Sequence, residues 1–297
     1  MRWPPHGGSF IKMGKEMDKT YWENAWDEAR LRSPGRARPE NEAKWASYWD
    51  EVADEYLRDV LAEESAYRSV IDYLLCRNVF RPWDRVLDIG CGPGTYSLLF
   101  AEGALTIDAL DPSAAMLAAM AKEASLRDLT GIRPFRARWD DFLPRRQYDL
   151  VFSAMSPGVR DTKSLLKMEA CSVRSCCLVT YGQAPGYGPR NDLWELVVGE
   201  PPSSNPFLYV YPYNVLREGG REPGLEMFDL KRTKTVPVEQ LVRQYVTYFG
   251  IFTGVDARKE RLIRDYFEAR SEDGLFEAKT QVRQAVISWA APRESAP

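Results

Sequence analysis

The segment VLDIGCGPGT (residues 86–95) constrains the fold of this 297-residue chain more than any other part of it. A short apolar run, 85–89, carries one acid and leads into three glycines, and a helix-like segment follows at 96–101. Glycine allows a sharp turn and lets a ligand lie against the backbone. The first turn of a helix offers free N–H groups. The segment therefore predicts a strand, a ligand-binding loop and a helix.

Strand-like and helix-like segments alternate after this unit. We predict strands at 106–110, 132–137, 148–153, 176–181, 226–236 and 279–289. We predict helices at 113–123, 162–170, 193–198, 238–248 and 257–270, the first capped by Asp111 or Ser113. Regular alternation of the two kinds predicts a parallel sheet with helices on both faces.

Three further segments lie outside this alternation. Residues 1–20 are expected to be disordered, and residues 21–80 to form an N-terminal helical cap, with apolar side chains at helical spacing over 41–78. Residues 182–224 are rich in glycine and proline and are expected to form an insertion after the fifth strand. We expect residues 81–297 to form a single domain that contains this insertion.

A second acid, Asp111, ends the next predicted strand about twenty residues after the glycines, where a carboxylate can accept ribose hydroxyls. Dinucleotide-binding folds place a third glycine where this chain has Thr95. Asp88, two residues before the first glycine, would repel a pyrophosphate but suits a ligand with an amino group. S-adenosylmethionine has an ammonium group, a ribose diol and no phosphate, so the pattern favours it over a nicotinamide dinucleotide.

Residues 85–182 resemble the nucleotide-binding half of class I S-adenosylmethionine-dependent methyltransferases. The resemblance rests on the glycine loop, on Asp111, on Trp139-Asp140-Asp141 after the third strand and on the fourth strand, 148–152. Residues 48–56 also resemble the helix that precedes this fold in small-molecule methyltransferases. The implied fold class is α/β: a Rossmann-like doubly wound sheet of about seven strands, mostly parallel with an antiparallel last strand, with an N-terminal helical lid.

The resemblance implies a cofactor site for S-adenosylmethionine, with S-adenosylhomocysteine as the product. The predicted cofactor-binding residues are Asp88, Gly90, Cys91, Gly92, Gly94, Asp111, Pro112, Met116, Trp139, Asp140, Ser153 and Tyr48. Alternatives stay open for four of them. Asp111 could cap a helix and Met116 could be core, while Asp140 or a stacked Trp139 could contact adenine. No catalytic residue and no metal ligand is predicted.

Aromatic side chains of the cap are either core or a lid over the reacting sulfur, whose positive charge aromatic faces attract. The lid residues would be Trp45, Tyr48, Trp49 and Tyr56. Further candidates for the pocket follow from their place after the fifth strand or in the insertion: Tyr181, Tyr187, Arg190, Tyr209, Tyr211 and Tyr213. Arg160 and Asp161 are interpreted as a solvated helix start.

Composition excludes several classes of function. The net charge of −3 argues against a nucleic-acid partner, and no apolar run reaches the roughly 20 residues that span a bilayer. The single histidine, His6, argues against histidine-based zinc or Ser-His-Asp chemistry. Five cysteines without a Cys-x-x-Cys pair indicate reduced, buried thiols. Segment 1–8 shows no secretory signal. We therefore expect a cytoplasmic monomer or homodimer with no membrane partner.

The predicted function is methyl transfer from S-adenosylmethionine to a small-molecule acceptor by in-line displacement. The fourth strand ends in Ser153-Ala154-Met155-Ser156-Pro157 and lacks the Asn/Asp-Pro-Pro-aromatic motif of enzymes that methylate amides or base amines. The alternative is a non-catalytic protein that binds the cofactor and uses the insertion to bind a partner. A nicotinamide-dependent oxidoreductase is a third hypothesis, and thiol chemistry at Cys171, Cys176 or Cys177 is a variant of the first.

Overall fold

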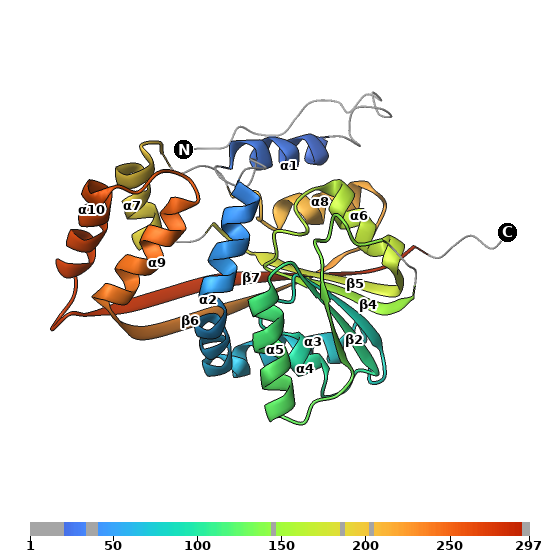
Figure 1. Cartoon of the computed structure of the whole chain (residues 1–297). Coiled ribbons are helices and arrows are strands. Elements are labelled where there is room, and N and C mark those ends of the chain that lie inside the picture. Colours follow the sequence, from blue (N-terminus) through green and yellow to red (C-terminus); the bar gives the residue numbers. More distant parts are fainter. Residues whose placement is uncertain (1–20, 34–40, 144–146, 185–187, 202–204, 293–297) are drawn as a thin grey trace, which may run out of the picture.

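The structure is a computed structural model that describes residues 21–33, 41–143, 147–184, 188–201 and 205–292 (Figure 1). Residues 1–20, for which disorder was predicted, and Tyr187, a candidate pocket residue, lie outside the described residues.

A seven-stranded sheet organises the molecule, with the strand order β3-β2-β1-β4-β5-β7-β6. The first five strands pair in parallel, and β7 runs antiparallel to both β5 and β6. The strands are β1 (Arg85–Ile89), β2 (Thr106–Asp111), β3 (Ile132–Arg136), β4 (Tyr148–Ala154), β5 (Ser172–Tyr181), β6 (Gly224–Pro237) and β7 (Leu275–Ala290). This arrangement confirms the predicted α/β fold class and its antiparallel last strand.

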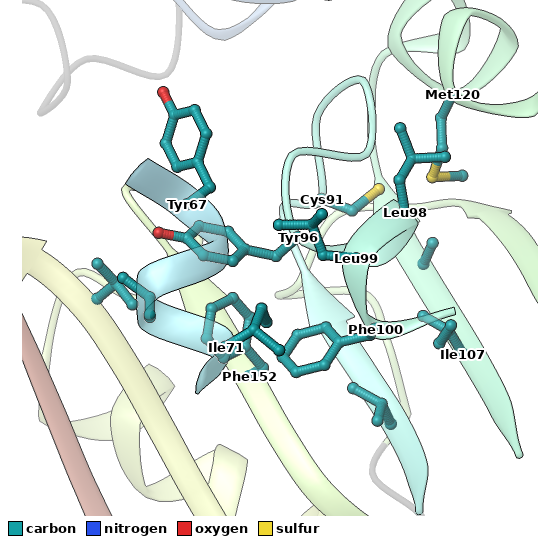
Figure 2. Packing of buried hydrophobic residues seen from close by; sticks show 14 of the residues in the cluster. Tyr67, Ile71, Cys91, Tyr96, Leu98, Leu99, Phe100, Ile107, Met120 and Phe152 are labelled. Atoms are coloured by element: carbon teal, nitrogen blue, oxygen red, sulfur yellow. The ribbon is translucent and has the colours of Figure 1, made fainter. Parts of the chain in front are cut away.

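Helices cover both faces of the sheet because successive residues of each strand point to opposite sides. On β4, Leu150 and Phe152 face one hydrophobic cluster while Val151 faces another. The first cluster packs α2 (Glu42–Ala62), α3 (Glu64–Cys76), α4 (Ser97–Phe100) and α5 (Ala114–Leu126) on the sheet. The second packs α1 (Tyr21–Arg32), α6 (Thr162–Cys171) and α8 (Val210–Glu218) on the opposite face. Figure 2 shows part of the first cluster, where Phe100 and Phe152 meet with ring centroids 5.0 Å apart.

A third hydrophobic cluster lies away from the centre of the sheet. The strands β6 and β7 are far longer than β1 to β4, and their paired ends continue past β5 as a two-stranded ribbon (Figure 1). Three helices pack together at its far end: α7 (Pro189–Val198), α9 (Val238–Gly250) and α10 (Ala257–Glu268). We call these three helices and the far end of the ribbon, residues 233–237 and 275–279, the satellite module.

Several boundaries differ from the sequence predictions: α7 and β7 begin four residues earlier than predicted, and α8 was not predicted. Two further differences have local reasons. The helical segment predicted as 41–78 is two helices, α2 and α3, separated at Glu63. Strand β5 begins at Ser172 rather than at 176, and its first part contains the polar residue Arg174. The guanidinium of Arg174 donates from Nη1 to Asp84 Oδ1 over 2.9 Å and from Nη2 to the Val79 carbonyl over 3.1 Å. Pairing with a buried acid allows an arginine within a strand that hydropathy alone does not detect.

Candidate active site

A cavity of about 450 Å³ opens at the carboxyl ends of β1, β2 and β4. This is the position at which open α/β sheets bind ligands, and the volume lies within the usual range of small-molecule sites. Its lining comes from the glycine loop, the segments after β2, β3 and β4, the helices α1 and α2, and the residues Pro206 and Phe207. Nine of the predicted cofactor residues line it: Asp88, Gly90, Cys91, Gly92, Asp111, Pro112, Met116, Trp139 and Asp140.

The glycine loop follows β1 and has an unusual backbone. Gly90, Gly92 and Gly94 have φ angles of +68°, +55° and +92°, which are left-handed values that other residues rarely adopt. A Cβ at Gly90 would stand 2.0 Å from Ser156 Oγ, so this glycine lets the loop after β4 approach closely. A Cβ at Gly92 would have only Tyr56 Cε1 near it, at 3.9 Å. The loop therefore exposes backbone to the cavity at Gly92.

Asp111 at the end of β2 holds this loop in place. Its Oδ2 accepts a hydrogen bond from Gly92 N over 3.0 Å, and its Oδ1 accepts one from Ser113 N over 2.9 Å. The cap of α5 is Ser113, whose side chain accepts from Met116 N, so Asp111 is not the capping residue. Burial raises the pKa of Asp111. Each carboxylate oxygen keeps a lone pair for another donor, such as a ribose hydroxyl.

Asp88 lies inside β1 beneath the same loop and is almost wholly buried. Ser97 Oγ donates to its Oδ2 over 2.6 Å. Burial raises the pKa of Asp88 to about 7, although the hydrogen bonds from Ser97 oppose the shift. A buried carboxylate without a cationic partner is costly, and a ligand ammonium group would lower that cost.

The far end of the cavity contains the residues expected near adenine. Met116 is buried there on α5. Trp139 is only 4% exposed, donates from Nε1 to the Ser164 carbonyl over 3.0 Å and stacks on Phe142. The amino group of Lys167 lies 4.4 Å from the centroid of the Trp139 ring. Most of the ring is therefore occupied by protein, which favours packing over stacking on a ligand.

Asp140 lies beside Trp139 and is partly exposed. Burial alone would raise its pKa, but the hydrogen bond from Arg160 Nη2, 2.5 Å long, and the positive charges of Arg138 and Lys167 bring it below the usual value. Arg160 was interpreted from the sequence as part of a solvated helix start. The structure instead places it in the cavity wall, paired with Asp140.

Three predicted cofactor residues do not line the cavity. Gly94 is a packing position, because a Cβ there would stand 2.6 Å from Met120 Cγ in α5. Ser153 is buried between strands and donates from Oγ to the Ile89 carbonyl over 3.0 Å. Tyr48 is buried against Trp45, Trp49 and Tyr248. Each of these contacts joins parts of the protein to one another.

The aromatic residues of α2 divide between the cavity and the core. Trp45, Trp49 and Tyr56 line the cavity, and the rings of Trp45 and Trp49 stack with centroids 6.2 Å apart. These three residues fit the predicted lid, whereas Tyr48 fits the core alternative. Asp50 fixes the lid to the cofactor end, because its Oδ1 accepts from Ser113 Oγ over 2.6 Å.

The aromatic candidates from the segment after β5 lie elsewhere. Tyr209 and Tyr213 pack on the cluster beneath α1, and Tyr211 meets Trp22 edge-on at 6.4 Å. Arg190 lies over the Tyr248 ring in the satellite module, 4.4 Å from its centroid. Neither these residues nor Tyr181 line the cavity, to which this segment contributes Pro206 and Phe207.

Several lining residues were not predicted from the sequence. Tyr67, Tyr96 and Gln284 come from three distant segments, and Tyr96 Oη donates to Gln284 Oε1 over 3.5 Å. Met155 has φ of +50°, a conformation that costs energy in a residue with a Cβ and is common at functional sites. Arg30 reaches the cavity from α1. No local motif marks any of them.

The cysteines show no sign of reactivity. Cys91, Cys171, Cys176 and Cys177 are buried, and burial raises the pKa of the Cys91, Cys176 and Cys177 thiols. The prediction was wrong for Cys76, which is exposed at the end of α3. In the described part of the chain, no group of three or more His, Cys, Asp or Glu side chains is arranged to hold a metal ion. Within the same residues, no helix is long and apolar enough to cross a membrane.

Comparison with known proteins identifies the central segment. Residues 86–170 match the family model described as "Methyltransferase domain". Together with the sheet order and the loop geometry, the match shows that this segment is a class I methyltransferase domain, the class that uses S-adenosylmethionine. The resemblance stated from the sequence is confirmed for this segment.

A relative in sequence aligns with this chain over a longer stretch than the family model does. An uncharacterised protein of Haemophilus influenzae is 32% identical over 120 residues, which are 40% of this chain and 44% of that protein. The chain therefore spans less than half the length of this relative.

Among solved structures, the YcgJ protein of Bacillus subtilis superposes with a TM-score of 0.50 at 14% identity, covering 78% of this chain and 99% of that one. Magnesium protoporphyrin IX methyltransferase from Synechocystis, solved with bound S-adenosylhomocysteine, gives 0.51 at 12% identity, covering 85% and 100%. A methyltransferase-like protein from Bacillus halodurans gives 0.50 at 12% identity, covering 75% and 99%. At these identities the likeness shows the fold.

Proposed function

We propose that this protein transfers a methyl group from S-adenosylmethionine to a small-molecule acceptor by in-line displacement. The observation that carries the proposal is the pair of buried acids, Asp88 and Asp111, around a glycine loop at the carboxyl end of the sheet. Residues 86–170 match a methyltransferase domain, which supports the same reaction.

The residues present fit this cofactor. Asp88 is buried, and no cation among the described residues pairs with it, so an ammonium group is the ligand that its carboxylate favours. Asp111 can accept ribose hydroxyls while it holds the loop through Gly92 N. Asp140 and Met116 both line the cavity, where an adenine ring would lie between them and the glycine loop. When bound, the cofactor supplies a methyl group already activated by a positive sulfur.

The protein's part in the reaction is then alignment and the exclusion of water. Orientation of two reactants can supply roughly 7–11 kcal/mol of the barrier. Trp45, Trp49 and Tyr56 form an aromatic wall on α2, and such faces attract a positive centre while they exclude solvent. Asp50 ties this wall to the cap of α5 through Ser113 Oγ. Ser113 in turn donates from its backbone N to Asp111, so the wall and this acid are linked through one residue.

Proton transfer has a small place in this mechanism. Two tyrosines of the cavity, Tyr67 and Tyr96, cannot accept a proton at neutral pH, because burial raises the pKa of each and keeps the phenol protonated. A base is optional in methyl transfer, since its value depends on the pKa of the nucleophile. The site therefore suits an acceptor atom that carries a lone pair at neutral pH without help, such as an unprotonated amine or a thiolate.

Calorimetric titration tests the proposal. S-adenosylmethionine and S-adenosylhomocysteine are titrated into the wild-type protein and into Asp111→Asn, followed by assay of methyl transfer to a panel of small acceptors. We expect micromolar binding to the wild type and an affinity at least 100-fold weaker in the variant, because asparagine replaces one of the two acceptor oxygens by a donor and removes the charge.

Asp108→Asn is the matched control. Asp108 is an equally buried acid on the same strand, β2, but it accepts from Arg133 Nε and Tyr148 Oη outside the cavity. This variant should lose stability and keep its cofactor affinity. Equal affinity in the wild type and Asp111→Asn would contradict the site. Binding of both ligands without transfer to any acceptor would instead support a non-catalytic binding protein.

A further inference from the structure

Arg30 brings a positive charge to the cavity from an element outside the matched domain. It lies in the last turn of α1, a helix that Figure 1 shows above the beginning of α2, and it lines the cavity together with Trp45 and Phe207. The helix is held firmly there, because Trp26 is buried and donates from Nε1 to the Pro206 carbonyl over 2.8 Å. The position of Arg30 is therefore set by packing.

Arg30 differs from the other two arginines of the cavity wall, Arg138 and Arg160, because it does not pair with Asp140. Arg138 and Arg160 both approach Asp140, at 3.3 and 2.5 Å. Arg30 Nη2 instead meets Asp27 at 3.3 Å, and the side chain of Asp27 is 53% exposed to solvent. The Nε atom of Arg30 is buried and has no hydrogen-bond partner among the described residues. The side chain of Arg30 as a whole is 30% exposed and lines the cavity, so its accessible part can meet a ligand oxygen there.

The surroundings of Arg30 indicate what kind of anion fits. The stacked rings of Trp45 and Trp49, together with Phe207, give the cavity flat apolar walls. Asp88 and Asp111 stand by the glycine loop and would repel a phosphate dianion from its N–H groups. A guanidinium matches the two oxygens of a carboxylate, and one arginine balances its single charge.

We propose that Arg30 is the carboxylate-binding residue of the acceptor subsite and that the acceptor is an aromatic carboxylate, whose ring lies against Trp45 and Trp49. This inference rests on the proposed function, since it assigns the substrate class of the same cavity. In this arrangement the acceptor binds through its carboxylate at Arg30. The ammonium and ribose groups of the cofactor bind at the other half of the cavity, where the two acids lie.

Titration of simple carboxylates into the protein saturated with S-adenosylhomocysteine tests the assignment. The probes are benzoate, 2-naphthoate and indole-3-acetate, each compared with its neutral amide. We expect at least one carboxylate to bind the wild type, and its amide to bind at least tenfold more weakly. Arg30→Gln should weaken that carboxylate at least tenfold and change the affinity for S-adenosylhomocysteine less than twofold.

Arg32→Gln is the matched control, since Arg32 lies two residues further on α1 and pairs with Glu28 at the surface. It should change neither affinity. Arg30→Lys keeps the charge without the planar fork and should give an intermediate loss, which separates recognition from unfolding. Thermal melting of each variant verifies that α1 remains packed.

Three results would overturn the assignment: no carboxylate binds the wild type, the amide binds as well as its carboxylate, or Arg30→Gln binds the carboxylate unchanged. The titrations are repeated without S-adenosylhomocysteine. A protein that binds carboxylates through Arg30 but binds neither cofactor form would retain the subsite and lose the proposed function, so the two failures are distinguishable.

Discussion

The methyltransferase segment and the satellite module are built from different kinds of sequence. In the segment, three glycines with positive φ and two acids at or near strand ends fix a backbone shape that few other residues allow. In the satellite module, α9 and α10 are ordinary amphipathic helices whose buried side chains, such as Phe249 and Phe267, could be exchanged for others of similar size. The first region is therefore recognised by its motifs and the second only by its packing.

The difference teaches where specificity can change. The satellite module reaches the cavity indirectly: Tyr248 and Phe252 pack on Trp45, whose ring faces the lid residue Trp49. Lys44 at the start of α2 donates from Nζ to the Gly250 carbonyl over 3.2 Å. A region without motifs thus supports the aromatic wall that we propose meets the acceptor, while the region with motifs carries the residues that we propose hold the cofactor.

The largest effect is expected when a core side chain is removed from the satellite module, which tests whether this module and the methyltransferase segment are independent. Phe249→Ala deletes a wholly buried ring and should cost about 3–5 kcal/mol of stability in that module. Hydrogen exchange should accelerate in α9 and α10 and change little in β1 and β4, with the affinity for S-adenosylhomocysteine within about threefold of the wild type.

Leu196→Ala, at an exposed position on α7, is the control and should change stability by less than about 0.5 kcal/mol. Equal acceleration of exchange in β1 and β4 would show that the two regions unfold as one unit.

The second test concerns the buried acid of the methyltransferase segment. Burial raises the pKa of Asp88 from 3.8 to about 7, so in the free protein the folded state binds this proton more tightly than the unfolded state. The contribution of Asp88 to stability is then complete below about pH 4 and is lost as the pH rises to about 7. The affinity for a ligand ammonium group has the opposite pH dependence and increases as the pH rises, because the ammonium group binds the ionised carboxylate.

We therefore expect the affinity for S-adenosylmethionine to rise roughly tenfold between pH 6 and pH 7.5, with uptake of the ligand accompanied by release of a proton at the lower pH. Calorimetry in buffers of different ionisation enthalpy measures that proton. Asp88→Asn should bind weakly at both pH values and lose this dependence. An affinity independent of pH in the wild type would show that Asp88 does not meet the ammonium group.

The smallest effect is expected at the ionic contact between α2 and β6. Lys234 Nζ meets Asp59 Oδ2 at 2.9 Å and Glu55 Oε1 at 3.2 Å, with all three side chains partly exposed. Lys234→Met should cost about 0.5–1 kcal/mol in denaturant unfolding, and the difference should shrink in 1 M salt. Lys231→Met, at an exposed position on the same strand, should leave the free energy of unfolding unchanged at low and at high salt.

How far the sequence predicted the site depends on whether the signal is local. The bounds of β1 and the glycine loop follow from adjacent residues, and the structure has that strand at the predicted positions. The spacing of Trp45, Trp49 and Tyr56 at four and seven residues puts them on one face of α2. Tyr48 is turned by about 60° to 100° from these three residues. Helical periodicity therefore puts Tyr48 at the edge of the predicted lid, and only the packing against Tyr248 shows that it belongs to the core.

Other parts of the site depend on contacts that no local pattern reveals. Arg30 reaches the cavity because Trp26 bonds to Pro206, 180 residues further along the chain. Ser153 follows the buried Phe152 on β4, and only the pairing of β4 with β1 shows that its hydroxyl bonds to Ile89. Gly94 has the sequence signature of a ligand loop, and only the packing of Met120 shows that it serves the helix.

The ribbon formed by β6 and β7 has a further consequence. Its pairing runs without a shift from Gly224 opposite Ser288 to Pro237 opposite Leu275. Because side chains alternate along a strand, deleting one residue from the middle of β7 would turn the side chains before the deletion to the other face relative to those after it. With the later half of β7 fixed by its pairing with β5, Phe276 and Ala278 would leave the satellite core on which they pack. Insertions and deletions here are thus tolerated only in pairs, so a change in ribbon length moves the three helices outward in steps of about 7 Å.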